Sequence, residues 1–281
     1  MAIAIVQHIR RMRGGAQSHL MRAADGHFYV VKFQNNPQHL RVLSNEWLGG
    51  KLAERLGLPA PACEIVEVGE WLIRKTPDLH MQLAGKQVAC RSGLHFGSRF
   101  VVSPMEGQVL DYLPESLLAE SRVRNLEAFA GALAFDKWLC NADGRQVVYW
   151  RRGRERKYAI AMVDQGHCFN DGEWIFPDSP LRGVFGSNEV YSRIVNWASF
   201  QPWLSRIENF PVNEMWKLSE TLPPVWYDAA WDAMQALVSK LIQRQSRVRE
   251  LIDAFRTSSR APFPRWSESS PAQSHVAGTT Q

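Results

Sequence analysis

The sequence contains few cysteines, and none of them is placed as in a metal site or a disulfide framework. Four cysteines are scattered through 281 residues, and no two form a Cys-x-x-Cys pair. Zinc sites and disulfide-stapled folds require closely spaced cysteines. Both classes are therefore excluded, and we expect free thiols in a reducing compartment such as the cytoplasm.

Long hydrophobic runs are also missing. The most apolar helical stretch covers only residues 128–135, whereas a membrane-spanning helix needs about 20 apolar residues. The N-terminal sequence MAIAIVQHIRRMR has no basic segment before its short apolar run, so it does not resemble a signal peptide. The sequence predicts an intracellular protein without a membrane span.

The charge balance is too small to indicate a class of partner. The 33 basic and 28 acidic side chains give a net charge of +5. This value is compatible with an anionic ligand but does not by itself indicate a nucleic-acid-binding protein. The hydrophobic fraction of 45% is typical of globular domains and excludes a mainly disordered chain.

The first hundred residues are expected to form strands and one helix. Residues 28–33, FYVVKF, are rich in β-branched and aromatic side chains and predict a strand. A helix is expected over 44–57, with a serine N-cap and a glycine stop. Residues 64–68 and 71–75 are expected to pair as a hairpin, and residues 99–104 to form another short strand.

The remainder of the chain is expected to be mainly helical. Apolar residues at close to 3.6-residue spacing predict a helix over 121–140 and a long helix over 228–255. Between them, residues 147–150 and 157–164 predict a second hairpin. From 257 to 281 the chain is rich in Ser, Pro and Ala, which is typical of a disordered tail.

Several short segments carry the residue types that phosphoryl transfer needs: backbone amides and a cation for phosphates, and carboxylates for a metal ion and for the nucleophile. In RGGAQSH, Gly14 and Gly15 allow the backbone to approach a phosphate and to present its N–H groups. Lys32 lies inside an apolar strand, and Glu46, early in the next helix, could pair with it. Taken alone, each has an ordinary alternative: a plain turn, a solvent-facing lysine, or an acid that complements the helix dipole.

Two aspartates complete the set. Asp143 lies in the polar loop NADGRQ, between the predicted helix and the second hairpin. Asp164 ends an apolar strand and is followed by Gln165 and Gly166; a carboxylate at such a position is a good magnesium ligand. Either aspartate could also be a turn residue, but together these features follow the order of a protein-kinase-like fold.

The motifs resemble those of the HipA-like kinases, a bacterial family with the kinase fold, and more distantly those of phosphatidylinositol kinases. GGAQSHLM is similar to the family's Gly-Ala-Gln nucleotide loop, YVVKF to its lysine strand, LCNADGRQ to its catalytic loop and VDQGHCF to its magnesium motif. The resemblance implies a two-lobed α+β fold with ATP between the lobes. The N-lobe would be residues 1–107, the helical C-lobe residues 108–256, and the tail residues 257–281.

The resemblance also implies roles for individual residues. Lys32 would bind the ATP phosphates, and Glu46 would fix the lysine. Asp143 would orient the attacking hydroxyl and accept its proton, while Asp164 would hold Mg²⁺. Residues 99–107 would supply the adenine hinge through backbone groups. The nucleotide loop would comprise Gly14, Gly15, Ala16, Gln17 and Ser18.

Two positions depart from the family's pattern. The family usually has a metal-binding asparagine five residues after the catalytic aspartate, where this sequence has Val148. Gln146 lies close by, and we take it as the candidate second metal ligand beside Asp164. His19 stands where a basic residue often follows the Gly-Ala-Gln motif.

Two further features lie outside these motifs. The run RRGRERK, residues 151–157, is either a solvated turn or a docking patch for an acidic or phosphate-bearing substrate. The C-terminal half is rich in tryptophan, which is expected to pack in the core, with stacking on nucleic-acid bases as the alternative.

The sequence therefore predicts a cytoplasmic, ATP- and Mg²⁺-dependent kinase whose acceptor is a Ser or Thr hydroxyl of a protein substrate. The alternatives are a kinase for a small molecule or a lipid head group, and a nucleotide-binding pseudokinase without turnover. The sequence names neither a particular protein partner nor an oligomeric state.

Overall fold

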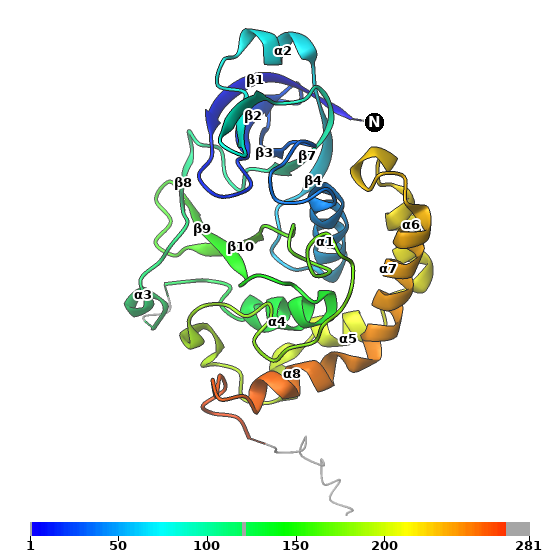
Figure 1. The fold of residues 1–281 in the computed structure, drawn as a ribbon. Helices are drawn as coiled ribbons and strands as arrows, with labels where there is room; N and C mark the ends of the chain where they lie inside the picture. The colour runs from blue at the N-terminus through cyan, green and yellow to red at the C-terminus, as the bar shows by residue number, and fades with distance from the viewer. Residues whose placement is uncertain (1, 120–121, 268–281) are drawn as a thin grey trace, which may run out of the picture.

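A closed five-stranded barrel forms most of the upper lobe in Figure 1. The computed structural model describes residues 2–119 and 122–267. The strand order is β1–β2–β3–β7–β4, and the pairing is antiparallel except where β1 closes the barrel beside β4. The barrel strands are β1 (Ile3–Arg11), β2 (His19–Ala23), β3 (Phe28–Lys32), β4 (Cys63–Val68) and β7 (Gly93–Arg99).

Strand β3 follows the sequence prediction closely and sets the direction of its lysine. Successive side chains of a strand point to opposite faces. Val31 and Phe33 are fully buried in the barrel core, whereas Val30 and Lys32 line the cavity between the lobes. The alternation therefore places one cation of an otherwise apolar strand in the cleft.

The predicted first hairpin, residues 64–68 with 71–75, is wrong. Residues Glu70–Lys75 form helix α2, and the first segment is β4. Both edges of β4 are already occupied, by β1 on one side and β7 on the other, so no edge is left for a hairpin partner. A separate hairpin forms from β5 (His80–Leu83) and β6 (Lys86–Ala89).

Helix α1 (Val42–Leu56) lies under the barrel and ends where the sequence predicts. Gly57 adopts a φ of 71°, the left-handed conformation that glycine adopts readily at a helix end. The helix begins before Ser44, so the expected serine N-cap is wrong. The Ser44 hydroxyl instead donates to the carbonyl of Trp226, 3.1 Å away.

The segment that connects the two lobes is irregular rather than a strand. Strand β7 ends at Arg99, so the strand predicted over 99–104 is wrong. The backbone N–H of Phe100 still donates to the carbonyl of Phe28 at 2.7 Å, but the chain then turns, with Glu106 donating to the Ser103 carbonyl at 2.9 Å. Beyond this turn the chain enters the lower sheet.

The lower lobe contains a three-stranded antiparallel sheet and a buried helix. The sheet order is β10–β9–β8, which confirms the second predicted hairpin. Helix α4 is shorter than the predicted 121–140; residues 122–127 form turns and a bridge, and residues 120–121 lie outside the described part. These elements are β8 (Gly107–Leu110), α4 (Ala128–Leu139), β9 (Gln146–Arg152) and β10 (Ala159–Val163).

The long helix predicted over 228–255 is two helices, α7 (Trp231–Arg244) and α8 (Val248–Arg256), separated by a 3₁₀ turn at Gln245–Arg247. The break coincides with two buried polar side chains. Arg244 donates to the carbonyls at the end of α4, and Gln245 donates to carbonyls near the end of α5. The remaining α-helices are α3 (Glu115–Ala119), α5 (Trp203–Glu208) and α6 (Val212–Glu220).

The larger hydrophobic core joins α1 to the helices of the lower lobe. Trp226 and Trp174 are buried in it, as the sequence predicts. Phe263 is buried too and stacks on Trp266, so the expected tail is wrong for residues 257–267; residues 268–281 lie outside the described part. Within the described part of the chain, no helix combines the length and the apolar character that crossing a membrane requires.

Candidate active site

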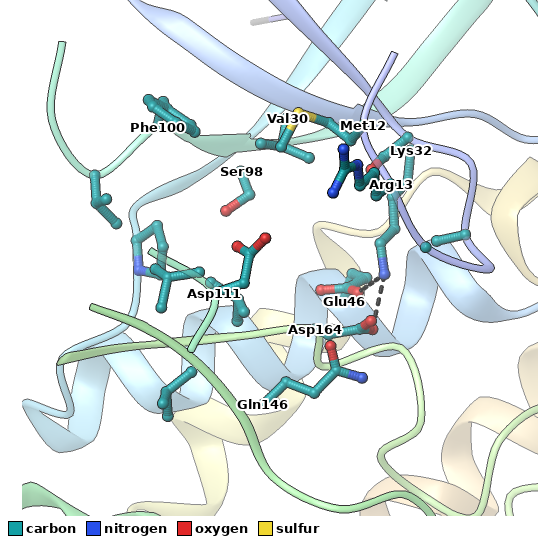
Figure 2. Close-up of a pocket in the computed structure, with 18 of the residues that line it drawn as sticks. Met12, Arg13, Val30, Lys32, Glu46, Ser98, Phe100, Asp111, Gln146 and Asp164 are labelled. Carbon is teal, nitrogen blue, oxygen red and sulfur yellow. Dashed lines mark hydrogen bonds and ion pairs between the residues drawn. The ribbon is translucent and has the colours of Figure 1, made fainter. Parts of the chain in front are cut away.

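A cavity of about 1070 Å³ lies between the barrel and the lower sheet. Segments far apart in the sequence line it, including the β1–β2 loop, β3, α1, the connecting segment and the ends of β9 and β10. Figure 2 shows its polar end around Lys32 and Asp164 and its opposite end around Phe100 and Ser98. The cavity is lined by nine of the residues singled out from the sequence: Gly14, Gly15, Ala16, Ser18, Lys32, Glu46, Asp143, Gln146 and Asp164.

The β1–β2 loop forms one wall of the cavity. Gly14 has a φ of 117°, a conformation that L side chains rarely adopt. Gln17 is the exception among the predicted loop residues, because its side chain faces β5 instead of the cavity. It donates to the carbonyl of Gln82 at 2.9 Å and accepts from the N–H of Gln82 at 2.7 Å. The Gln17 side chain therefore anchors the loop to the separate β5–β6 hairpin.

Three charged side chains from distant segments meet at the polar end of the cavity. The Lys32 ammonium contacts the Glu46 carboxylate and lies 2.8 Å from Asp164 Oδ1. The second oxygen of Glu46 accepts the backbone N–H of Gln165 at 3.0 Å, and its first oxygen accepts that of Gly166 at 3.0 Å. The pairing expected between the strand lysine and the helix glutamate is present, and it joins β3 and α1 to the end of β10.

The Lys32 ammonium and the Asp164 carboxylate stabilise each other's charged form. Burial opposes the ionised form of Asp164, but the Lys32 ammonium outweighs burial and lowers the pKa of this carboxyl from 3.8 to about 2. Burial likewise opposes the charged form of Lys32, yet the carboxylates of Glu46 and Asp164 raise its pKa above the usual value. At neutral pH the cleft therefore holds a fixed ammonium beside an ionised carboxylate.

The loop after α4 presents Asp143 at the mouth of the cavity. Cys140 ends the helix in the left-handed conformation, with a φ of 50°. Asp143 is exposed and accepts the Gly144 N–H at 2.8 Å and the Gln146 amide at 3.1 Å. The Gln146 side chain is thus tied to Asp143 through its nitrogen, and Figure 2 shows it lying below Asp164. Val148, at the position of the missing asparagine, pairs with Ala161 in the sheet and lines the cavity.

Two buried residues that the sequence did not single out hold this loop. Arg145 donates through Nε to Asp136 at 2.8 Å, and through its other nitrogens to the Val163 carbonyl and the Gln165 amide oxygen, both at 2.9 Å. Asn141 also donates to Asp136, at 3.0 Å. The sequence signal that could have revealed this contact is Asp136, an acid that directly follows the apolar stretch 128–135 in the same helix. Because an acid is rarely buried without a cationic partner, its position predicts a nearby basic side chain.

Asn45, which the sequence also did not single out, fixes the segment after Asp164. Its amide nitrogen donates to the carbonyls of Gly166, Cys168 and Asp171 at 2.9, 2.9 and 2.6 Å. Its amide oxygen accepts the Trp174 indole N–H at 2.8 Å. A single buried side chain of α1 therefore holds both ends of the turn that follows the expected metal ligand.

Arg13 and Asp111 are further charged residues that line the cavity. Figure 2 shows Arg13 next to Lys32 at the polar end, and the Asp111 carboxylate projecting from the opposite side. The Arg13 guanidinium adds a second cation where phosphates would lie. Asp111 is exposed and directly follows β8. The path of the chain between the lobes brings it to the cleft, and the sequence analysis did not predict that path.

The basic run 151–157 does not lie beside Asp143. It occupies the far end of β9, and Gln146, which contacts Asp143, begins that strand. Seven residues of strand span about 20 Å. Arg152 instead lines a second cavity of about 620 Å³ behind the connecting segment, together with Arg99 and Trp150. A docking role for this run next to the catalytic loop is therefore not supported.

The oxygen donors near the polar end fit a hard divalent cation. Asp164 offers a carboxylate, and Gln146 offers an amide oxygen; Mg²⁺ binds such ligands and keeps several waters. Within residues 2–119 and 122–267, no group of three or more His, Cys, Asp or Glu side chains is placed to hold a metal ion. The four cysteines are all buried and free, which confirms the expectation of unpaired thiols.

Solved structures with a similar fold include two kinases. The Helicobacter pylori proinflammatory kinase CtkA is 12% identical, with a TM-score of 0.52 over 88% of this chain and 99% of that chain. Hydra Fam20 is 12% identical, with a TM-score of 0.52 over 91% of this chain and 86% of that one. The Golgi casein kinase is 13% identical, with a TM-score of 0.50 over 90% of this chain and 75% of that one. At such low identity these matches show the fold alone, and they confirm the predicted two-lobed kinase architecture.

A sequence comparison with curated proteins gives no match. A family model described as HipA-like kinase matches residues 5–151. This match covers more than half of the chain and includes the β1–β2 loop, Lys32, Glu46 and Asp143. The chain therefore belongs to the HipA-like kinase family.

Proposed function

We propose that the protein is an ATP-dependent phosphotransferase that phosphorylates Ser or Thr hydroxyls of a protein substrate. The observation that carries the proposal is the cluster of Lys32, Glu46 and Asp164 in a cavity large enough for a nucleotide and part of an acceptor. Phosphoryl transfer relies almost entirely on positioning and on electrostatic stabilisation of the phosphates. A buried ammonium held between two carboxylates supplies both.

The two ends of the cavity suit the two ends of ATP. Val30, Phe100 and Val148 provide apolar side chains for a base, and the irregular segment 99–107 brings its backbone to the same wall. At the other end, Lys32 and the glycines of the β1–β2 loop can face the phosphates. A nucleotide bound in this direction would place its γ-phosphoryl group near Asp164 and Asp143.

Asp164 and Gln146 would hold Mg²⁺, which neutralises phosphate charge when bound. Asp164 is already ionised beside Lys32, so cation binding requires no proton loss. Asp143 would orient the acceptor hydroxyl and take its proton. Because Asp143 is exposed at the mouth of the cavity, its acceptor can belong to a macromolecule, which favours a protein substrate over a small enclosed one. The free cysteines are in keeping with the reducing cytoplasm.

The test separates nucleotide binding from transfer. Asp143→Ala should still be stabilised by Mg-ATP in a thermal-shift assay but transfer phosphate about 100-fold more slowly. Asp164→Ala should lose the Mg-dependent part of nucleotide binding as well. Asp232→Ala, which removes an exposed aspartate of α7, is the matched control and should behave as wild type. Transfer is measured with radiolabelled ATP and a cell extract as the source of acceptor proteins.

Three outcomes would revise the proposal in different ways. Undiminished transfer in both active-site variants would refute the assigned roles of Asp143 and Asp164. Nucleotide binding without transfer in wild type would identify a pseudokinase. Label that appears in small molecules or lipids, and not in proteins, would identify the alternative acceptor class.

A further inference from the structure

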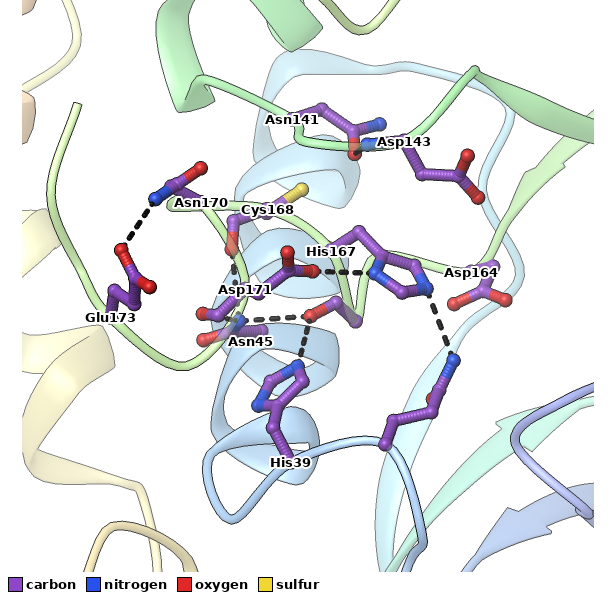
Figure 3. A network of polar contacts seen from close by, with 12 residues as sticks. His39, Asn45, Asn141, Asp143, Asp164, His167, Cys168, Asn170, Asp171 and Glu173 are labelled. Carbon is purple, nitrogen blue, oxygen red and sulfur yellow. Dashed lines mark hydrogen bonds and ion pairs between the residues drawn. The ribbon is translucent and has the colours of Figure 1, made fainter. Parts of the chain in front are cut away.

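A histidine that lines the same cavity, His167, is paired with an aspartate on the side of the catalytic loop (Figure 3). His167 Nδ1 lies 2.6 Å from Asp171 Oδ1, and its Nε2 lies 3.0 Å from the Gln38 amide nitrogen. The ring lines the cavity, and 23% of the side chain is exposed. The His167 carbonyl accepts the N–H of Ala142 at 2.8 Å, so the residue is bound directly to the loop that carries Asp143.

The Asp171 carboxylate accepts hydrogen bonds, so Nδ1 is protonated and donates to it. With the Gln38 amide nitrogen turned toward the ring, Nε2 offers its lone pair; the same amide turned over would instead accept a hydrogen bond from Nε2. An imidazole with one nitrogen held by a carboxylate and the other presenting a lone pair is an oriented nucleophile.

The segment that carries Asp171 is held in an unfavourable backbone conformation. Phe169, Asn170 and Asp171 have φ values of 60°, 57° and 60°, which are uncommon for residues other than glycine. Such conformations persist only where the surroundings enforce them, and they cluster at functional sites. Here Asn45 enforces the turn through three hydrogen bonds, two of them buried, and the turn aims the Asp171 carboxylate at His167.

Gln38 is an incomplete partner for the ring. Its amide oxygen is buried without a hydrogen-bond partner among the described residues, which is unfavourable for a buried acceptor. The amide can relieve this unsatisfied group by turning over or by moving aside, so Gln38 does not hold Nε2 to one fixed partner. A phosphoryl group on Nε2 would offer its oxygens to the Gln38 amide nitrogen in place of the lone pair.

We propose that His167 is a phosphoryl acceptor: its Nε2 takes the γ-phosphoryl group of ATP bound in the cleft. This inference rests on the proposed function and adds to it a modification site on the enzyme itself. The Nε2 lone pair forms a bond to the γ-phosphorus while the bond from that phosphorus to the bridging oxygen breaks. ADP leaves with the electron pair, and no proton is released. Nδ1 keeps its proton, and the Asp171 carboxylate balances the positive charge that the ring acquires.

The experiment incubates the full chain with Mg²⁺ and γ-³²P-labelled ATP and follows label bound to the protein. A phosphorus–nitrogen bond is stable in alkali and labile in acid, whereas phosphoserine and phosphothreonine are acid-stable. We expect acid-labile label that excess unlabelled ADP removes, because the phosphoryl group on imidazole returns readily to ADP. His167→Asn, which keeps a donor toward Asp171 and lacks the second ring nitrogen, should abolish this label.

Two further variants complete the test. Asp171→Asn should slow labelling by about 10² to 10⁴-fold, the range expected when a group that orients a reactive imidazole is lost. His27→Asn, which removes an exposed histidine of the barrel, should label as wild type does. Thermal shift with Mg-ATP is measured for each variant, because it reports folding and nucleotide binding independently of transfer.

The outcomes separate this inference from the proposed function. Acid-stable label only, or acid-labile label that persists in His167→Asn, overturns the assignment of His167 and leaves the kinase proposal standing. Binding of Mg-ATP without acid-labile label also overturns it. Absence of both nucleotide binding and label in wild type refutes the proposed function, and the inference falls with it.

Discussion

Replacing Lys32 by methionine tests the centre of the site most directly. Methionine keeps an unbranched apolar stem and removes the ammonium. The variant leaves the carboxylates of Glu46 and Asp164 facing each other, and loss of one partner from a buried ion pair destabilises a protein by about 3–5 kcal/mol. Asp164 keeps 18% of its side chain exposed, and Glu46 keeps two backbone N–H donors. We therefore expect a loss of about 2–4 kcal/mol in the free energy of unfolding, which a typical domain survives.

The same variant should change how stability depends on pH. The folded-state pKa of Asp164 is about 2, against an ordinary value of 3.8. A carboxyl whose pKa is lower in the folded state adds stability above its unfolded pKa and loses it as the pH falls through the folded value. The shift corresponds to about 2 kcal/mol. Wild type should lose this contribution between about pH 4 and pH 2, and Lys32→Met should lose much less of it.

Urea unfolding of wild type and Lys32→Met across this pH range measures both effects, and thermal shift with Mg-ATP measures the nucleotide interaction. Lys240→Met, at an exposed position of α7, is the matched control. We expect Lys32→Met to be less stable at neutral pH and to gain less stabilisation from Mg-ATP. Unchanged unfolding, an unchanged acid dependence and an unchanged nucleotide shift would together show that the lysine is an ordinary surface residue.

Three other substitutions test parts of the site and of the fold. Asp136→Ala should destabilise the protein by about 3–5 kcal/mol in urea unfolding, because Arg145 would keep a buried charge without its carboxylate; a change below about 1 kcal/mol would contradict this pairing. Gln146→Ala should raise the Mg²⁺ concentration needed for half-maximal phosphoryl transfer, and an unchanged metal dependence would make the glutamine a loop residue only. Gly131→Ala would place a methyl group 2.4 Å from the Trp203 ring and should lower stability by about 1–3 kcal/mol, whereas an unchanged melting temperature would refute that close contact.

The elements that the sequence predicts well are those whose signals are local. Strand β3 is specified by its β-branched residues, the end of α1 by Gly57, and the β9–β10 hairpin by two apolar runs around a charged turn. The same holds for the site: Lys32, Asp143 and Asp164 each stand at a recognisable junction of elements. The resemblance to HipA-like kinases added the expectation that these junctions, which are distant in the sequence, meet around one nucleotide cleft.

The errors arise where a distant segment decides the structure. Residues 70–75 have strand-like composition, but β1 and β7 already occupy both edges of β4, so a helix forms instead. The composition of residues 257–267 is typical of a disordered tail, but in the structure the Phe263 ring packs against Tyr191 and Phe255. Neither β-strand pairing nor such a space between helices has a signal in the segment itself.

The glycines inside α1 show how a locally unfavourable residue can indicate a site. Each glycine in a helix interior is about 1 kcal/mol less favourable than alanine, so Gly49 and Gly50 weaken the helix prediction. In the structure, a Cβ at Gly49 would lie 2.9 Å from the Cβ of Gln165, and one at Gly50 would lie 2.9 Å from the sulfur of Cys63. Without Gly49, α1 could not approach the segment after Asp164 closely enough for Glu46 to bond the Gln165 and Gly166 amides, and Gly50 allows the close approach of α1 to β4. The loss of helix propensity is therefore offset by the polar contacts that hold the cleft together.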